Sequence, residues 1–180
     1  RAVSKVAGIR RVRISSLEPT ELTEELLKLF EEEPKLARHL HLPLQSGDDS
    51  ILRAMNRHYD SSYFRGAVEG ARRRLGDIGI TTDVIAGFPG ETEQMFENTL
   101  AMVSRLGFMH VHAFPYSVRR GTPAAGMPGQ VPEHVKADTA HIILFVRGGG
   151  LLLADAQKQL DEKTQAVLNA INENRKGKIR

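Results

Sequence analysis

The chain has 180 residues, of which 41% are hydrophobic and 26% charged, and this composition is typical of a globular protein with one sizeable core. Because it contains no cysteine, disulfides, zinc–thiolate sites, iron–sulfur ligation and thiol nucleophiles are excluded from the chemistry of the chain itself. The net charge of +3 and the clustered arginines suit a polyanionic partner, although ordinary solvated arginines would give the same counts.

The first quarter of the chain predicts two strands around one helix. Residues 11–16 alternate apolar and polar side chains and stop before Pro19, which indicates a strand followed by a turn. Thr20 is then expected to cap a helix that ends at Pro34, since leucines recur there at helical spacing. A second strand is expected at 39–44.

The next segments repeat this alternation of helix and strand. We expect helices at 49–55, from Asp60 onward and at 92–107, and strands at 80–86 and 110–115. Four short strands separated by helices indicate βαβ units with parallel strands joined by right-handed crossovers. The predicted fold class is therefore α/β, with a sheet that is either covered on both faces or closed into a barrel.

The pattern changes after about residue 132. Residues 151–174 predict an amphipathic helix, whose buried positions would be Leu153, Leu160, Val167 and Ile171. An interaction helix, an outer covering helix and an engineered extension all remain open for this tail. The sequence shows no run of about 18 apolar residues and no cleavable leader, so we expect a cytoplasmic protein without a membrane span.

Each expected strand ends in a polar or glycine-rich stretch. In parallel α/β folds, ligands bind at the carboxyl ends of the strands, so these stretches predict one shared ligand-binding rim. The four stretches are Ser15–Glu18, Gln45–Asp48, Gly87–Glu91 and Tyr116–Gly121.

Three motifs in or near this rim have both a functional and a structural interpretation. The sequence "GFPGE" at 87–91 either brings backbone close to a ligand or forms a tight turn whose acids stabilise a helix start. Arg119 and Arg120 either bind phosphate or carboxylate groups or belong to an exposed loop. The pairs His39/His41 and His110/His112 each place both rings on one face of a strand. They lie early in their strands, so we favour packing or solvent roles over a metal site.

Four stretches occurring in order resemble the second half of the radical-SAM barrel of the methylthiotransferases. They are "RVRISSLEP", "RHLHLPLQSGDDSILRAMNR", "ITTDVIAGFPGET" and "HVHAFPYSVRRGTPAAGMPGQVP". The wording of "SSLEP" and "HAFPYS" is most similar to the branch that acts on threonylcarbamoyladenosine in tRNA. The resemblance implies a partial (βα) barrel of parallel strands with outer helices over residues 1–135, followed by a C-terminal helical tail of uncertain origin at 136–180.

The resemblance also implies a function and a site. The parent enzyme would bind S-adenosylmethionine (SAM) and 4Fe-4S clusters, and would methylthiolate a modified adenosine in tRNA. Gln45, Ser46 and Gly47 would border the adenosyl group, and Gly87, Phe88, Pro89, Gly90 and Glu91 would shape the adenine and ribose side. Asp83 and Glu18 would orient polar atoms in the barrel mouth, and Arg119 and Arg120 would face the substrate.

The sequence departs from that family in several respects. It contains no cysteine to hold a cluster, and it has Ser117-Val118-Arg119-Arg120 where relatives usually read Ser-Pro-Arg-Pro. We therefore expect the chain alone to be inactive, with no catalytic side chain and no metal ligand of its own. The alternatives are a methylthiotransferase for a ribosomal protein and a non-catalytic engineered or truncated half-barrel scaffold. Such a scaffold could self-associate through an open sheet edge or the C-terminal helix.

Overall fold

A computed structural model describes residues 1–137 and 139–140, and the expected tail helix at 151–174 lies outside the described residues. The centre of the fold is a parallel sheet of three strands, in the order β1 (His39–His41), β2 (Gly79–Ala86) and β3 (His110–Pro115). The sheet confirms the predicted α/β class with parallel strands. The chain divides into two units, Arg1–Leu144 and Phe145–Arg180, so the first unit extends past residue 135.

Four α-helices accompany the sheet, and each begins at a side-chain cap. They are α1 (Glu24–Glu32), α2 (Asp49–Ala54), α3 (Ser61–Leu75) and α4 (Glu93–Leu106), capped by Thr23, Asp48, Asp60 and Thr92. Each cap accepts a hydrogen bond from a backbone N–H of the first turn, which satisfies a donor that the helix itself cannot pair. Short 3-10 helices at Val3–Lys5, Pro19–Glu21 and Pro123–Gly126 complete the described elements.

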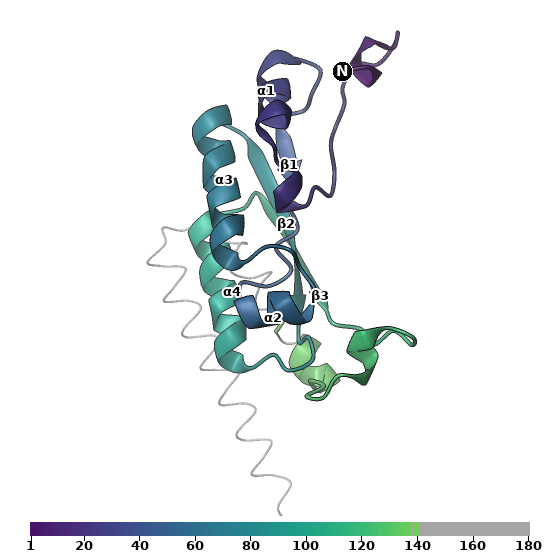
Figure 1. Cartoon of the computed structure of the whole chain (residues 1–180), viewed down its shortest axis with the longest axis vertical. Helices are drawn as coiled ribbons and strands as arrows, with labels where there is room; N and C mark the ends of the chain where they lie inside the picture. The colour runs from purple at the N-terminus through teal and green to yellow at the C-terminus, as the bar shows by residue number, and fades with distance from the viewer. Residues whose placement is uncertain (138, 141–180) are drawn as a thin grey trace, which may run out of the picture. The chain divides into compact units, whose positions relative to one another are not determined.

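The long helices cover one face of the sheet, and α3 and α4 run along it (Figure 1). Alternate strand residues point toward these helices and are at most 1% exposed: Leu40, Ile80, Thr82, Val84 and Val111. They form one core with helix side chains such as Phe64, Val68, Val103 and Leu106. The intervening strand residues point to the other face, which carries polar side chains.

The expected strand at 11–16 is wrong, because only Val12 pairs there. Its N–H donates to Lys35 O and its carbonyl accepts from Ala37 N, both at 2.8 Å, in a single parallel bridge to Leu36. The backbone then leaves the ladder and turns at Ser16, where φ is 57°. The segment returns to the sheet only where Leu17 N donates to His41 O at 3.0 Å.

The expected start of the first helix at Thr20 is also wrong. Glu18 and Glu21 close a 3-10 turn there, since the side chain of Glu21 accepts from Glu18 N at 2.8 Å. The α-helix starts only at Glu24, after Thr23. Thr20 and Thr23 both match the preference for an N-cap residue. The hydrogen bond from Glu18 N to Glu21 forms a 3-10 turn around Thr20, so the α-helix is capped by Thr23.

The second strand is shorter than the expected range 39–44 because Pro43 has no N–H to donate. The hydroxyl of Thr82 bridges the gap: it accepts from Leu44 N at 2.9 Å and donates to Leu42 O at 2.7 Å. Parallel pairing resumes at Gln45, which bridges to Val84. The buried hydroxyl of Thr82 thus replaces the missing backbone hydrogen bonds, and the chain continues beside β2 to the carboxyl edge of the sheet.

Candidate functional site

Three of the four predicted rim stretches meet at the carboxyl edge of the sheet. Gln45 bridges to Val84 near the end of β2, Gly87 follows β2, and Tyr116 N donates to Ala86 O at 2.8 Å. The stretch at 15–18 lies beside the end of β1 through the hydrogen bond from Leu17 N.

Gln45 is the most constrained residue of this edge. Its φ is 66°, in the left-handed region that non-glycine residues rarely adopt. Both of its backbone groups are held in the ladder, by donation to Asp83 O at 2.8 Å and by acceptance from Ile85 N at 2.9 Å. The residue is 9% exposed, and its side-chain amide makes no hydrogen bond to any described residue. A strained backbone beside a side-chain amide without a partner is typical of a binding residue.

Ser46 and Gly47 join this edge of the sheet to helix α4. Gly47 N donates to the hydroxyl of Thr99 in α4 at 2.8 Å, and Ser46 is fully buried beside the same hydroxyl. A side chain at Gly47 would lie 2.6 Å from Thr99 Cα and 2.7 Å from Asn98 O. The glycine is therefore required for the close approach of helix α4.

The turn at 87–91 uses most of its own donors. Gly87 N donates to the carboxylate of Glu91 at 2.5 Å, Gly90 N to Gly129 O at 2.8 Å, and Glu91 N to Phe88 O at 2.9 Å. These N–H groups are thus engaged within the chain. The turn offers a ligand the exposed backbone at Gly90, while Phe88 and Pro89 are buried.

Glu91 is held in the same turn as a desolvated acid. Burial is the largest cause of a shift that raises its pKa to about 7; the hydrogen bond from Gly87 N lowers the pKa, and the negative charge of Asp48 raises it. The carboxyl group therefore changes protonation near neutral pH.

Tyr116 was expected on this rim without a role of its own, and Lys136 was not expected there at all. The ring of Tyr116 packs edge-on against Phe88 at 5.2 Å, and its buried hydroxyl has no hydrogen-bond partner among the described residues. Lys136 is 1% exposed; its ammonium donates to Tyr116 O at 3.1 Å and to Glu133 at 2.7 Å, and its stem fills the space beside Gly87. A lone lysine in a polar helical segment gives no sequence signal for such burial.

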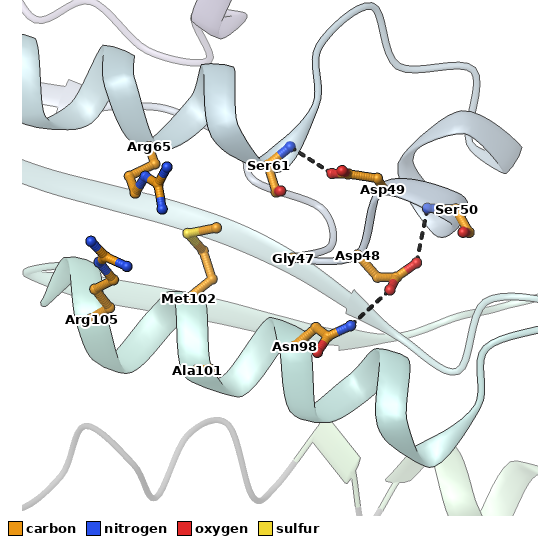
Figure 2. Close-up of a pocket in the computed structure, with 10 residues that line it drawn as sticks. All are labelled: Gly47, Asp48, Asp49, Ser50, Ser61, Arg65, Asn98, Ala101, Met102 and Arg105. Atoms are coloured by element: carbon orange, nitrogen blue, oxygen red, sulfur yellow. Dashed lines mark hydrogen bonds between the residues drawn. The ribbon is translucent and has the colours of Figure 1, made fainter.

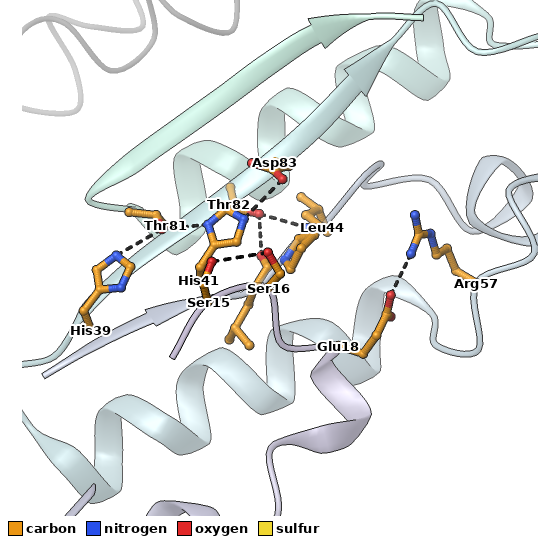
Figure 3. Close-up of polar contacts among 12 residues, drawn as sticks. Ser15, Ser16, Glu18, His39, His41, Leu44, Arg57, Thr81, Thr82 and Asp83 are labelled. Atoms are coloured by element: carbon orange, nitrogen blue, oxygen red, sulfur yellow. Dashed lines mark hydrogen bonds and ion pairs between the residues drawn. The ribbon is translucent and has the colours of Figure 1, made fainter. Parts of the chain in front are cut away.

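The three residues expected to face the substrate are on the surface and not in one cluster. The carboxylate of Glu18 is paired with Arg57 at 2.7 Å (Figure 3). Arg119 and Arg120 are exposed in the loop after β3, and among the described residues Arg119 is bonded through its carbonyl to Thr122.

The polar face of the sheet carries the predicted histidine pairs. His41 contacts Thr81 at 2.9 Å and Asp83 at 3.2 Å, and Thr81 also contacts His39 at 3.1 Å (Figure 3). The ring of His112 lies 6.0 Å from that of His41 and 4.2 Å from that of His110. His39 is 8% exposed, in line with the expected packing role, whereas both β3 rings are exposed. Within residues 1–137 and 139–140, no three acidic or imidazole groups are arranged to hold a metal ion.

An open groove of about 370 Å³ lies between α2, α3 and α4 on the helical side (Figure 2). Its carboxylates are already engaged: Asp48 caps α2 and accepts from Asn98 at 2.9 Å, while Asp49 accepts from Ser61 N at 2.8 Å. Arg65 and Arg105 face the groove from α3 and α4. Its polar groups mainly join the helices to one another.

The chain has a parallel α/β sheet with helices on one face, whose strands lead to a polar edge, and in parallel α/β folds ligands bind at such an edge. The chain belongs to the radical SAM superfamily: the sequence model described as "Radical SAM superfamily" matches residues 1–103.

The relatives that the chain resembles include tRNA methylthiotransferases. The chain is 40% identical over 141 residues to "Threonylcarbamoyladenosine tRNA methylthiotransferase MtaB" of Bacillus subtilis, which covers 78% of the chain and 31% of the relative. It is 46% identical over 134 residues to "tRNA-2-methylthio-N(6)-dimethylallyladenosine synthase" of Caldicellulosiruptor saccharolyticus, which covers 74% of the chain and 28% of the relative. The chain thus spans about a third of the length of these relatives.

Two solved structures share the fold at low sequence identity. Coproporphyrinogen III oxidase (HemN) from Escherichia coli aligns with a TM-score of 0.60 at 21% identity, over 73% of the chain and 30% of that protein. Elp3 of Methanocaldococcus infernus aligns with a TM-score of 0.55 at 17% identity, over 76% of the chain and 32% of that protein. No described helix is long and apolar enough to cross a membrane.

Proposed function

We propose that the chain is the C-terminal part of the radical SAM barrel of a cytoplasmic tRNA methylthiotransferase, and that it holds SAM at the carboxyl edge of its sheet. The observation that carries the proposal is the left-handed backbone of Gln45 at this edge, together with a side-chain amide that makes no hydrogen bond to a described residue. The unpaired hydroxyl of Tyr116 is a second buried polar group there, and a bound ligand would satisfy it.

The residues of the edge fit the cofactor as binding groups. Gln45 and Asp83 would supply polar contacts to the adenosyl group, and the exposed backbone at Gly90 would allow its close approach. SAM and a 4Fe-4S cluster supply the radical chemistry in this superfamily, so the side chains of this chain bind and orient rather than react. The cluster ligands belong to the parent protein, since the chain has no cysteine. Ser46, Gly47 and Gly87 act by shaping the edge, through their packing on Thr99 and Lys136.

Threonylcarbamoyladenosine in tRNA is the proposed substrate of the parent enzyme. The "SSLEP" and "HAFPYS" stretches and the 40% identity to MtaB support it. Dimethylallyladenosine in tRNA is the second candidate, because the 46% identity to a synthase of that product favours it. Glu18, Arg119 and Arg120 would face the RNA, and the exposed arginines suit its phosphates. Self-association through the sheet edge or the tail remains a prediction.

The cofactor site is tested by titrating the 180-residue chain with SAM and following its backbone resonances by NMR. We expect weak, saturable shifts at residues 45, 83 and 90, and a loss of at least about tenfold in affinity for Gln45→Ala, which removes the side-chain amide. Gln94→Ala is the matched control, because Gln94 is exposed on α4. Equal affinities of the two variants would contradict the proposed site.

The substrate is tested in chimeras in which residues 1–135 replace the matching segment of B. subtilis MtaB or of the C. saccharolyticus synthase. Mass spectrometry of digested tRNA measures the methylthiolated nucleosides. We expect product in the MtaB chimera and less than a tenth of it in the other. Product only in the synthase chimera would assign the second substrate.

A further inference from the structure

Five side chains form a continuous hydrogen-bonded line across the polar face of the sheet. Arg13 Nε donates to His39 Nδ1 at 3.2 Å, and His39 Nε2 lies 3.1 Å from the hydroxyl of Thr81. The same hydroxyl lies 2.9 Å from His41 Nδ1, and His41 Nε2 lies 3.2 Å from Asp83 Oδ2. Figure 3 shows the part of the line from His39 to Asp83.

The direction of every bond in this line is fixed from its Arg13 end. A guanidinium group has no acceptor and stays protonated, so His39 Nδ1 must be the unprotonated nitrogen. The neutral ring then carries its proton on Nε2 and donates it to Thr81. Burial and the charge of Arg13, followed by that of His41, lower the pKa of His39, which agrees with a neutral ring.

The Asp83 end agrees with this direction. An ionised carboxylate only accepts, so His41 Nε2 must carry a proton. Thr81 already accepts from His39 and has its own proton left to donate, and His41 Nδ1 is the acceptor within reach. Both histidines therefore hold the Nε2–H tautomer, and each proton points from Arg13 toward Asp83.

We propose that Arg13, His39, Thr81 and His41 form a one-way hydrogen-bond relay that positions Asp83 as an acceptor for a donor group of the cofactor. The inference rests on the proposed function and deepens it, because it names positioning residues that do not touch the ligand. The relay holds Asp83 Oδ2 through His41. Asp83 Oδ1 makes no hydrogen bond to a described residue and is left for a ligand hydroxyl or N–H.

His112 and the residues of the opposite face do not take part in the relay. His112 lies opposite Asp83 in the register and contacts the ring of His41 edge-on at 6.0 Å, too far for a hydrogen bond to it. Leu40 and Thr82 point to the opposite face and do not compete for the same donors.

The proton positions are tested in the 180-residue chain by nitrogen-15 NMR of the imidazole rings at pH 8. We expect both His39 and His41 to be protonated at Nε2 only. In Arg13→Met the donor to His39 Nδ1 is lost, so His39 should populate both tautomers. A proton on Nδ1 of either ring in the wild-type chain would overturn the relay.

The positioning role is tested by SAM titration of Thr81→Val and Thr81→Ser. Valine removes the hydroxyl at nearly constant volume, so the affinity should fall about three- to tenfold, and serine, which keeps the hydroxyl, should restore it to within about twofold. Equal affinities of the valine variant and the wild type would overturn the role. A wild-type chain with both expected tautomers but no SAM binding would overturn the proposed function and leave the relay supported.

Discussion

The same strands form both faces of the sheet, but different interactions hold the two faces. Toward the helices, Leu40, Ile80 and Val111 are at most 1% exposed and contribute dispersion and hydrophobic burial. On the other face, His41, Thr81 and Asp83 contribute directed hydrogen bonds. The first face fixes where the strands lie, and the second fixes where their polar atoms point.

Two consecutive threonines show the difference most directly. Thr82 points to the helical face, is fully buried, and repairs the backbone beside Pro43. Thr81 points to the polar face and joins two histidines. The same hydroxyl group therefore stabilises the fold in one position and orients the site in the next.

The largest expected effect is a loss of stability from a substitution on the helical face, compared with a substitution on the polar face. Leu40→Ala removes a fully buried side chain and should lower the free energy of unfolding by about 3 kcal/mol. His112→Ala, on the exposed polar side, should change it by about 0.5 kcal/mol or less. Urea denaturation followed by circular dichroism measures both. Similar losses would mean that the polar face also carries the fold.

Glycines sharpen the comparison at the helical face. Gly47→Ala should cost about 2–3 kcal/mol, because the added methyl group would meet the backbone of α4, which cannot move aside as a side chain can. Gly66→Ala in α3 is the control: its new methyl group meets nothing within 4 Å, and alanine favours a helix by about 1 kcal/mol. Thermal melts should shift in opposite directions, and a shift of the same sign would contradict the packing at Gly47.

Thr82→Val tests the structural threonine. It leaves the N–H of Leu44 and the carbonyl of Leu42 without their buried partner, so we expect a loss of about 2 kcal/mol in stability. Thr82→Ser should recover most of it. Thr81→Val should cost less, about 1 kcal/mol, because it leaves two imidazole nitrogens without a partner but no backbone group. A larger loss for Thr81→Val than for Thr82→Val would reverse the roles assigned to the two faces.

Much of the fold could be predicted because its signals are local. The alternation in β2 and β3 and the helical spacing around them were enough to place these strands and the helices α2 and α3 within one or two residues. Residues 11–16 failed because alternation does not reveal whether a neighbouring strand is in reach. Pro43 was visible in the sequence, but the hydroxyl of Thr82 that compensates for it comes from a strand about forty residues later.

The location of the candidate site at the carboxyl edge could be predicted from the sequence, but most of its side-chain contacts could not. Gln45 and Gly87 could be assigned to one rim from parallel topology alone. The unpaired hydroxyl of Tyr116 and the burial of Lys136 depend on packing between distant segments, which no pattern records. The histidine pairs were visible, but the relay needs Arg13 and Thr81, which are ordinary residues until the register brings them together.

The smallest expected effect concerns Glu91, an acid held in the turn between the two faces. Its pKa is raised from 4.5 to about 7, so its contribution to stability is fully present below pH 4.5 and is lost as the pH rises through 7. Glu91→Gln keeps an acceptor for Gly87 N without the buried charge, and so lacks this loss. The variant should match the wild type within a few tenths of a kcal/mol at pH 4.5 and be more stable by about 1 kcal/mol at pH 8. Chemical denaturation across this range measures the difference, and Glu97→Gln, at an exposed position of α4, should show no such trend. If Glu91→Gln were instead less stable than the wild type at pH 8, the charged hydrogen bond to Gly87 would outweigh the cost of burying the carboxylate.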